Sequence, residues 1–232
     1  MKSLKTLLLY CHGLGASPYN KFAQRMKQAV ESRNLNFQSV LYRNVGAKKM
    51  WDVDEWLEDI LLHVDRMKKE GYLRTVLVGF SGGCHGVLRA AVKRPNDISG
   101  LFLLAPGVGL HLKSYVTRAM PEIAKELLSG KAVVYPAAKD GYPALIKADC
   151  LQKYSEKCIS NRLASIPIRC PVRILHGADD EIVPLENVER FIRQLQSKDV
   201  VMKVLPGVGH FIPVSRYFNN VFGGGEHLQC CI

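Results

Sequence analysis

The sequence predicts a doubly wound α/β fold, in which a mainly parallel sheet carries a short cap insertion. Three observations support this prediction: six short runs are apolar throughout, helical patterns alternate with them, and one long interval breaks the alternation. Strands that are apolar on both sides are typical of a parallel sheet with helices on both faces. A length of 232 residues suits one domain, so we expect residues 1–232 to form a single unit.

The predicted elements follow the hydrophobic pattern along the chain. Strands are expected at residues 6–11, 37–42, 75–80, 98–105, 172–176 and 200–205. Helices are expected at residues 20–32, 51–69, 82–92 and 185–195. Residues 108–169 are long and mixed in character and carry two Tyr-Pro pairs. We expect this interval, between the fourth and fifth strands, to form a cap or lid within the domain.

The charge and hydropathy of the sequence argue against nucleic acid as a partner and against a membrane span. The formal net charge is +11, but Lys and Arg are scattered and no basic run is interleaved with aromatic residues. We therefore expect no nucleic-acid binding. No segment reaches the ~20 apolar residues of a membrane span, and the apolar run at residues 7–9 is too short for a secretory signal. We expect a cytoplasmic location and no membrane span; the oligomeric state is not predicted.

The cysteine pattern argues against disulfides and against zinc. The chain has seven cysteines, an odd number, with no C-x-x-C pair and no Cys/His spacing suited to zinc. A reducing compartment and the absence of a metal site are the expected consequences. Cys230 and Cys231 do not fit the prenylation motif, because Gln229 stands where that motif needs cysteine. We expect this end of the chain to carry no lipid.

The sharpest motif lies between the third predicted strand and the helix that follows it. Residues 79–83 read Gly-Phe-Ser-Gly-Gly and fit the pattern G-x-S-x-G in the context that this pattern requires. A nucleophile on so tight a turn needs small neighbours two residues away, and Gly79 and Gly83 meet that demand. The turn lifts the hydroxyl above the carboxyl end of the sheet. Ser81 is therefore the predicted nucleophile.

A serine hydroxyl is a weak nucleophile near neutral pH and needs a general base and an acid to orient that base. His210 follows the sixth predicted strand, and three acidic residues, Asp179, Asp180 and Glu181, follow the fifth. The chain order of serine, acid and histidine is the order that a strand–Ser–helix nucleophile demands. All of these residues lie just past the carboxyl ends of strands, where open parallel sheets place their sites.

Two backbone amides are expected to hold a developing oxyanion. One is the N–H of Gly82, directly after the nucleophile, and the other is the N–H of Leu14, in the loop after the first strand. His12 has a glycine neighbour, so we expect it to shape this loop rather than to catalyse. His85 is expected to have a packing role, and His176 is expected to shape the end of its strand rather than to catalyse.

These four motifs, in this order across residues 12–210, resemble the serine hydrolases of the α/β-hydrolase superfamily. Residues 170–177, together with Pro184, are similar to the palmitoyl-protein thioesterase and acyl-glucuronide esterase branch. The resemblance implies that the acid stands four positions after His176, at Asp180. It also implies hydrolysis of an acyl ester or thioester through an acyl-enzyme without metal or cofactor, and it adds mitochondria as an alternative location.

Two rival functions share these motifs. A peptidase or amidase on the same fold would use the same residues, and a non-catalytic binding protein could retain the pocket. Apolar cap residues could line an acyl pocket, although at helical spacing they are more often plain core: Leu110, Tyr115, Val116, Met120, Ile123, Leu127 and Leu128. The sequence departs from the superfamily pattern at its end, where residues 211–222 could form only a short helix before Gly223.

Overall fold

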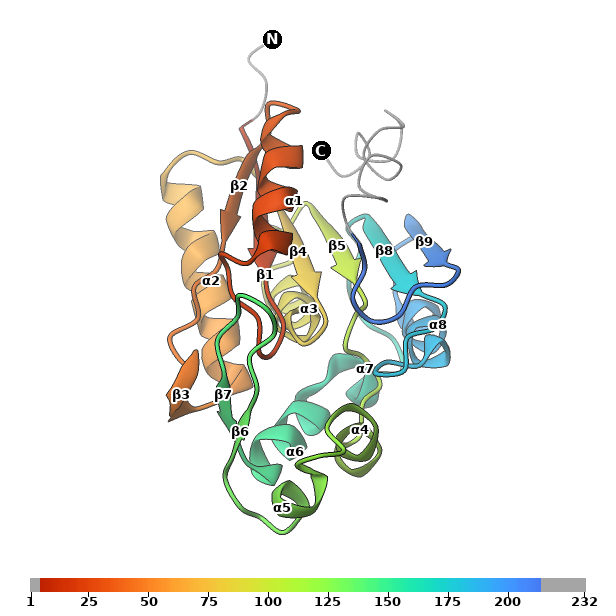
Figure 1. Ribbon diagram of the computed structural model, residues 1–232. Helices are drawn as coiled ribbons and strands as arrows, with labels where there is room; N and C mark the ends of the chain where they lie inside the picture. Colours follow the sequence, from red (N-terminus) through yellow and green to blue (C-terminus); the bar gives the residue numbers. More distant parts are fainter. Residues whose placement is uncertain (1–4, 214–232) are drawn as a thin grey trace.

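A six-stranded sheet lies at the centre of the structure, a computed structural model that describes residues 5–213 (Figure 1). Its strands, in spatial order, are β2 (Asn36–Ser39), β1 (Thr6–Cys11), β4 (Arg74–Phe80), β5 (Gly100–Leu104), β8 (Val172–Gly177) and β9 (Val200–Leu205). Every neighbouring pair in this sheet is parallel. The predicted mainly parallel sheet is confirmed.

The strands β1, β4, β5 and β8 form the interior of the sheet because they are apolar on both faces. Nearly all of their residues are buried, whereas β9, at the edge, alternates between partly buried and exposed positions. The register pairs Cys11 of β1 with Gly79 of β4, and Phe80 with Leu104 of β5. The carboxyl ends of these strands therefore meet at one edge, where sheets of this type bind ligands.

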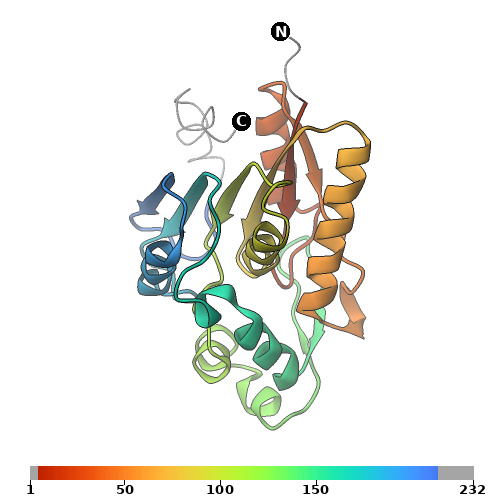
Figure 2. The ribbon, with the colours of Figure 1, turned by 180° about the vertical axis from the view of Figure 1, so that it is seen from behind.

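Helices cover both faces of the sheet. They are α1 (Lys21–Glu31), α2 (Val53–Lys69), α3 (Gly83–Lys93) and α8 (Leu185–Gln194). On one face, Ala23, Met26 and Val30 of α1 pack in a cluster with residues of β1, β4 and β5. On the opposite face, which Figure 2 shows, α2, α3 and α8 contribute to a larger cluster. This arrangement confirms the doubly wound fold.

Two predicted boundaries differ from the structure for local reasons. The predicted helix 51–69 begins at Val53, because the side chain of Asp52 accepts a hydrogen bond from the Asp54 N–H (2.7 Å) and acts as the N-cap. The predicted strand 37–42 is the shorter β2. After Val40, whose N–H still donates to the Tyr10 carbonyl (2.8 Å), the chain leaves the sheet.

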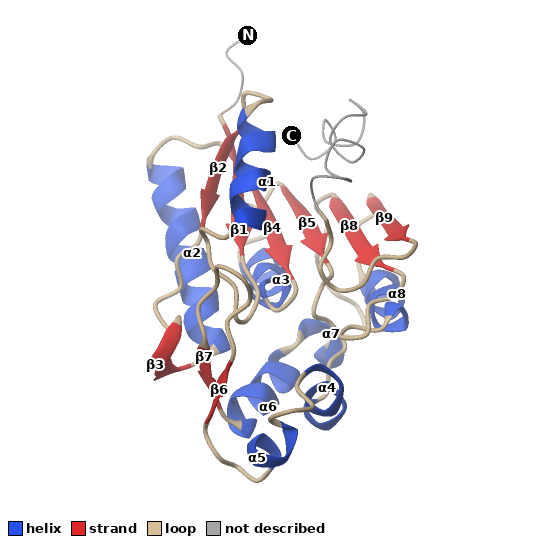
Figure 3. Cartoon of the chain, in the orientation of Figure 1, coloured by secondary structure: helices blue, strands red, loops and turns tan. Residues whose placement is uncertain are grey.

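The chain between β5 and β8 forms a separate layer beyond the carboxyl ends of the sheet (Figure 3). Its elements are α4 (Leu112–Ala119), α5 (Ala124–Leu128), β6 (Val133–Tyr135), β7 (Ala144–Ile146), α6 (Ala148–Lys157) and α7 (Ile159–Arg162). None of these elements joins the central sheet. They lie where residues 108–169 were expected to form a cap, and a role for them as a lid stays a prediction.

A small second sheet was not predicted. The strand β3 (Gly46–Met50) pairs in parallel with β7, which pairs with β6 in antiparallel fashion. Two of its three strands have only three residues, which is too short for a periodic pattern to stand out from the sequence. The pairing ties the segment before α2 to the layer formed by residues 112–162.

Some predictions concern residues outside those described. The predicted short helix at residues 211–222 lies almost wholly beyond residue 213, as do Cys230 and Cys231. Between residues 5 and 213, the structure contains no helix with the length and apolar character that crossing a membrane requires.

Candidate active site

Ser81 occupies a sharp turn between β4 and α3. Its backbone has a φ of 51°, in the left-handed region that non-glycine residues rarely adopt. Such a conformation costs about 1–3 kcal/mol, so the surroundings must hold it in place. The Ser81 N–H donates to the Leu104 carbonyl (2.9 Å), and the Ser81 carbonyl accepts from the Cys84 and Gly107 N–H groups (3.0 and 3.1 Å). These bonds fix the turn that was predicted from residues 79–83.

The two elbow glycines face closely packed atoms. A Cβ atom on Gly79 would lie 2.9 Å from Cys84 Cα. On Gly83 it would overlap the Cys11 carbonyl oxygen and lie 2.6 Å from that of His12. The atoms that Gly83 faces are backbone atoms of β1 and of the loop after it, and Gly79 faces the backbone of α3; neither can move aside cheaply. Steric demand at both positions thus agrees with the sequence argument.

Replacing Gly83 with alanine is expected to lower the free energy of unfolding by about 3 kcal/mol, because the new methyl group must displace the end of β1. Gly82 offers a matched control, since a Cβ there would meet only ordinary contacts, 3.7 Å from the Leu14 nitrogen and 3.9 Å from the Trp56 ring. We expect Gly82→Ala to change stability by less than about 1 kcal/mol. Urea unfolding measures both, and equal stability of the two variants would refute the steric account.

The structure brings Ser81, His210 and Asp180 together from the ends of β4, β9 and β8. The Ser81 hydroxyl lies 2.8 Å from Nε2 of His210, and Nδ1 of His210 lies 2.8 Å from Oδ2 of Asp180. The other oxygen, Oδ1, accepts hydrogen bonds from the N–H groups of Ile182 (2.9 Å) and Val183 (2.8 Å). With its proton on Nδ1, His210 donates to Asp180 and accepts from Ser81.

Of the three acidic residues after β8, only Asp180 is buried. Asp179 and Glu181 are exposed. Burial raises the pKa of Asp180, but the hydrogen bond and charge of His210 and the Val183 N–H outweigh it, so the pKa is lowered overall. The carboxylate therefore stays ionised around neutral pH. An ionised Asp180 can hold the His210 ring and stabilise its protonated form.

Two free amides lie beside Ser81. A Cβ placed on Gly82 would be 3.7 Å from the Leu14 nitrogen, so the loop after β1 closely approaches the start of α3. Neither the Leu14 nor the Gly82 N–H donates a hydrogen bond within residues 5–213. The structure thus places both predicted oxyanion donors at the nucleophile. A negative charge on oxygen could satisfy them together.

An aromatic cluster supports the loop that carries Leu14. The buried His12 ring contacts Tyr42 (centroids 4.7 Å apart) and Trp56 (5.8 Å), and burial lowers the pKa of His12 to about 4. A neutral His12 agrees with the predicted structural role. Trp56 also lies next to Gly82 and donates from Nε1 to Asn44 (2.7 Å). Its position beside Gly82 and the His12 ring was missed, because an aromatic residue at helical spacing looks like ordinary core.

The side chains of His85, His176 and Cys84 are also buried, and His176 Nε2 lies 3.8 Å from Asp180 Oδ2. His85 stacks on Tyr154 (4.2 Å between centroids), and burial lowers its pKa to about 3. Nε2 of His176 lies 3.0 Å from the Val183 carbonyl oxygen, behind Asp180. Cys84 is fully buried, and burial raises the pKa of its thiol. Among the residues that the structure describes, no group of His, Cys, Asp and Glu is arranged to hold a metal ion.

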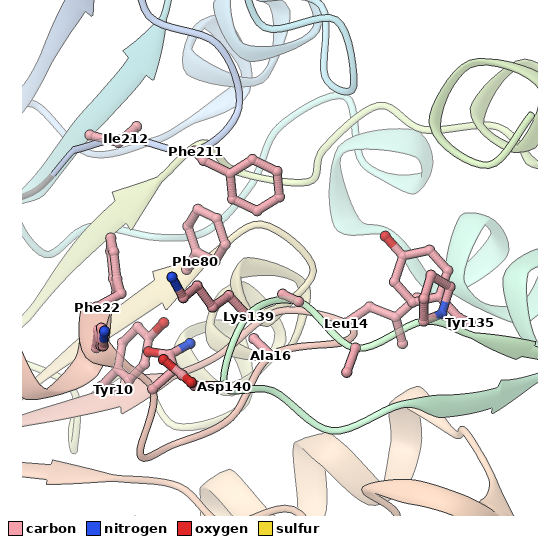
Figure 4. A pocket seen from close by; sticks show the side chains of 15 residues that line it. Tyr10, Leu14, Ala16, Phe22, Phe80, Tyr135, Lys139, Asp140, Phe211 and Ile212 are labelled. Atoms are coloured by element: carbon pink, nitrogen blue, oxygen red, sulfur yellow. The ribbon is translucent and has the colours of Figure 1, made fainter.

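Two cavities flank the candidate site. The larger, about 470 Å³, lies between α1, the β6–β7 connection and the residues next to Ser81 and His210 (Figure 4). We call it the aromatic cavity, and its lining is Tyr10, Leu14, Ala16, Asn20, Lys21, Phe22, Phe80, Tyr135, Pro136, Ala137, Ala138, Lys139, Asp140, Phe211 and Ile212. The smaller, about 20 Å³, is lined by Ser81, Gly82 and Leu14, and is closed by Trp51, Leu110, Tyr115, Leu151 and Tyr154.

The aromatic cavity was not predicted. Of the apolar residues suggested for an acyl pocket, only Leu110 and Tyr115 line a cavity at the site, and that cavity is the small one. The others belong to the core, are partly buried against it or, as Leu128, are exposed. The residues of the large cavity come from four distant segments, so no local pattern could have indicated them.

Comparison with known proteins places these observations in a wider group. The sequence profile described as "Serine aminopeptidase, S33" (Hydrolase_4) matches residues 43–162. Palmitoyl-protein thioesterase ABHD10, mitochondrial, from Mus musculus is 32% identical over 151 residues, which are 64% of this chain and 48% of the relative. The protein of the same name from Rattus norvegicus is 31% identical over a match of the same extent. The chain spans about half the length of these curated relatives.

Solved structures share the fold at lower identity. The alpha/beta hydrolase domain-containing protein 10 from mouse has a TM-score of 0.70 at 24% identity, covering 88% of this chain and 81% of that one. A soluble variant of monoglyceride lipase from Saccharomyces cerevisiae has a TM-score of 0.74 at 20% identity, covering 98% and 87%. Both support the α/β-hydrolase fold.

Proposed function

Because the chain belongs to the serine aminopeptidase S33 family (Hydrolase_4) of α/β-hydrolase serine hydrolases, we propose that it hydrolyses carboxylic esters or thioesters through an acyl-enzyme. One observation carries the proposal: two 2.8 Å hydrogen-bond contacts link Ser81 to His210 and His210 to Asp180. Beside them lie two amides without partners in the described structure. This arrangement has the parts that acyl transfer needs.

The proposed reaction proceeds in two halves. Ser81 Oγ attacks the substrate carbonyl carbon while His210 Nε2 takes the hydroxyl proton, and the N–H groups of Gly82 and Leu14 donate to the resulting oxyanion. The intermediate collapses, the carbon–oxygen or carbon–sulfur bond breaks, and His210 protonates the leaving group. Water then attacks the acyl carbon while His210 takes one of its protons. The bond from that carbon to Ser81 Oγ breaks, His210 returns the proton to Oγ, and the acid is released.

We propose that the acyl group lies in the aromatic cavity. The small cavity, about 20 Å³, has room for little more than one water molecule. The aromatic cavity is about 470 Å³, and it begins at Leu14, Phe80 and Phe211, the neighbours of the reacting residues. An apolar acyl chain of medium or long length suits such a lining. The curated relatives named as palmitoyl-protein thioesterases agree with this class of substrate.

Cleavage of peptides is the alternative that the family description suggests. An aminopeptidase must hold the positively charged amino terminus of its substrate, for which a carboxylate near the nucleophile is the usual partner. Among residues 5–213, no carboxylate lines the small cavity, and the single one that lines the aromatic cavity, Asp140, is exposed. The site therefore favours an uncharged acyl group over an amino-terminal residue.

A substrate series tests the proposed function. Acetyl, octanoyl and palmitoyl thioesters are compared with aminoacyl amides, using wild type and Ser81→Ala. Each buried CH₂ contributes up to about 0.8 kcal/mol, so we expect kcat/KM to rise at least about 100-fold from acetyl to octanoyl. Faster turnover of the amides than of every thioester would favour the peptidase.

Filling the aromatic cavity is expected to alter chain-length preference. Ala138 lines the cavity from the β6–β7 connection, and a phenylalanine there would take up part of its volume. We expect Ala138→Phe to lower kcat/KM for the palmitoyl thioester at least about tenfold and to leave the acetyl thioester within about threefold. Ala164→Phe, at an exposed position outside the cavity, is the control. Equal losses for both chain lengths would place the acyl group elsewhere.

The names of the curated relatives bear on location. They carry the word mitochondrial, and we propose that compartment for this chain in preference to the cytoplasm. Fractionation of cells that produce the untagged full-length protein, followed by protease protection of the mitochondria, tests this. Recovery in the cytosolic fraction alone would overturn it.

A further inference from the structure

A third cavity, which shares no lining residue with the two cavities at the candidate site, lies between α3 and the end of the α6–α7 segment. In Figure 2, α3 lies in front of the sheet, on the face opposite α1, and α6 and α7 lie below it. The cavity measures about 260 Å³. Four cations and three apolar side chains line it: Arg89, Lys93, Lys157, Arg162, Val92, Ile159 and Leu163. No carboxylate from the described part of the chain contributes to the lining, and we call this space the basic cavity.

Two carboxylates near the start of α2 neutralise part of this positive charge. Asp54, at the start of α2, contacts Arg89 (2.6 Å), Lys157 (2.5 Å) and Lys153 (2.9 Å). Lys153 also contacts Asp52 (2.6 Å). Three cations thus share two carboxylates. The network holds Arg89 and Lys157 in place and leaves one positive charge in excess.

The remaining two cations have no such neutralisation. Lys93 and Arg162 are exposed, and neither has a carboxylate within 4 Å among residues 5–213. The cavity and its supporting network therefore carry five cations against two carboxylates. Such an excess around a concave surface attracts anions.

Helix dipoles explain only part of this pattern. Lys93, Lys157 and Arg162 lie in the last turns of α3, α6 and α7, where a cation offsets the negative end of the helix. That effect accounts for a cation at each helix end. It does not require the ends to converge on one cavity, nor does it require the apolar wall formed by Val92 and Leu163.

We propose that the basic cavity binds a phosphate ester that carries a compact apolar group. The phosphate oxygens accept charge-assisted hydrogen bonds from Lys93 and Arg162, with Arg89 and Lys157 contributing charge at the base of the site. The apolar group packs on Val92, Ile159 and Leu163. This site lies outside the proposed hydrolytic centre, and its existence does not depend on the proposed function.

The proposal is tested by measuring how tightly the full-length chain binds phenyl phosphate and inorganic phosphate. NMR and calorimetry detect the binding. The test variant is Lys93→Gln/Arg162→Gln, and the matched control Lys125→Gln/Arg169→Gln removes the same charges from exposed positions outside the cavity. Phenyl phosphate should bind the test variant at least about tenfold more weakly than wild type, and the control within about threefold. Unchanged urea unfolding shows that each variant folds.

A third variant tests the apolar part of the site. Leu163→Ala should weaken phenyl phosphate several-fold and leave inorganic phosphate unchanged, because only the phenyl ring contacts this wall. Ser81→Ala should bind phenyl phosphate as wild type does, which separates this site from the hydrolytic one. Equal binding of phenyl phosphate by wild type, test and control variants would overturn the proposal, as would no binding by folded wild type.

The source of the phosphate is resolved by a lipid arm of the same experiment. Wild type is sedimented with phosphatidylcholine vesicles that contain or lack phosphatidic acid. Capture by phosphatidic acid that Lys93→Gln/Arg162→Gln abolishes, and that phenyl phosphate competes away, identifies a lipid headgroup in the cavity. Binding of phenyl phosphate without such capture identifies a soluble phosphate ester.

Discussion

Replacing Ser81 with alanine is expected to lower kcat for thioester hydrolysis by about 10⁶-fold, the loss typical when the nucleophile of such a triad is removed. The reason is geometric. Ser81 Oγ lies within hydrogen-bonding distance of His210 Nε2, at 2.8 Å, and the free amides of Gly82 and Leu14 lie beside the turn that presents it. Without Oγ no acyl-enzyme can form, and only binding and the oxyanion donors assist water.

The rate of thioester hydrolysis by the purified protein measures this loss. Ser114→Ala serves as the control. Ser114 lies exposed on α4, so its replacement should leave kcat within about twofold of wild type. The urea midpoint of unfolding of both variants should be no lower than that of wild type. Ser81 adopts a strained left-handed conformation that alanine does not worsen, and Ser114 is exposed. A Ser81→Ala protein with wild-type kcat would show that another residue performs the chemistry.

Replacing Asp180 with asparagine is expected to lower kcat by about 10⁴-fold. The Asn oxygen can still accept the Ile182 and Val183 N–H groups that now bind Oδ1, so the loop should keep its shape. The amide nitrogen then faces His210 Nδ1 and donates to it. His210 is forced to carry its proton on Nε2 and can no longer accept the proton of Ser81.

Asp179 provides the matched control for this second prediction. It neighbours Asp180, has the same side chain, and is exposed. We expect Asp179→Asn to retain kcat within about threefold of wild type, with the two variants equally folded by near-ultraviolet circular dichroism. Similar losses in both variants would mean that the effect arises from the negative charge of the loop as a whole rather than from the contact with His210.

The central sheet could be predicted because each of its inner strands has a local hydrophobic pattern. β1, β4, β5 and β8 are runs of apolar residues, and burial on both faces requires no more information than that. The turn at Ser81 was equally predictable. Gly79 and Gly83 are expected there for a steric reason, and in the structure a Cβ atom at either position would meet backbone atoms within 3 Å. The distance between the nucleophile and its base then follows from where parallel strands end.

The choice of acid depended on more than the local sequence. Asp179, Asp180 and Glu181 have the same chemistry and adjacent positions, and only the family resemblance favoured Asp180. In the structure, Asp180 alone turns inward, because the N–H groups of Ile182 and Val183 hold its Oδ1. Backbone hydrogen bonds determine this turn, and they produce no periodic pattern in the sequence.

The aromatic cavity could not be predicted from the sequence. Its walls combine Tyr10 of β1, Phe22 of α1, Tyr135 of β6 and Phe211. Each of these residues would pass for ordinary core when taken alone. Their convergence depends on the small sheet of β3, β7 and β6, which positions the β6–β7 connection against the loop after β1, where the Ala138 N–H donates to the Gly15 carbonyl (2.8 Å). No pattern within one segment could indicate it.

Labelling by a fluorophosphonate probe tests the central claim most directly, because the probe reacts only with a serine whose hydroxyl is activated by a base. Wild type is compared with Ser81→Ala and His210→Ala, and the labelled peptide is identified by mass spectrometry. We expect labelling of wild type at Ser81, none in Ser81→Ala, and a loss of at least about 10³-fold in labelling rate for His210→Ala. Folded wild-type protein that resists the probe would contradict the hydrolase and favour a binding protein that keeps the pocket.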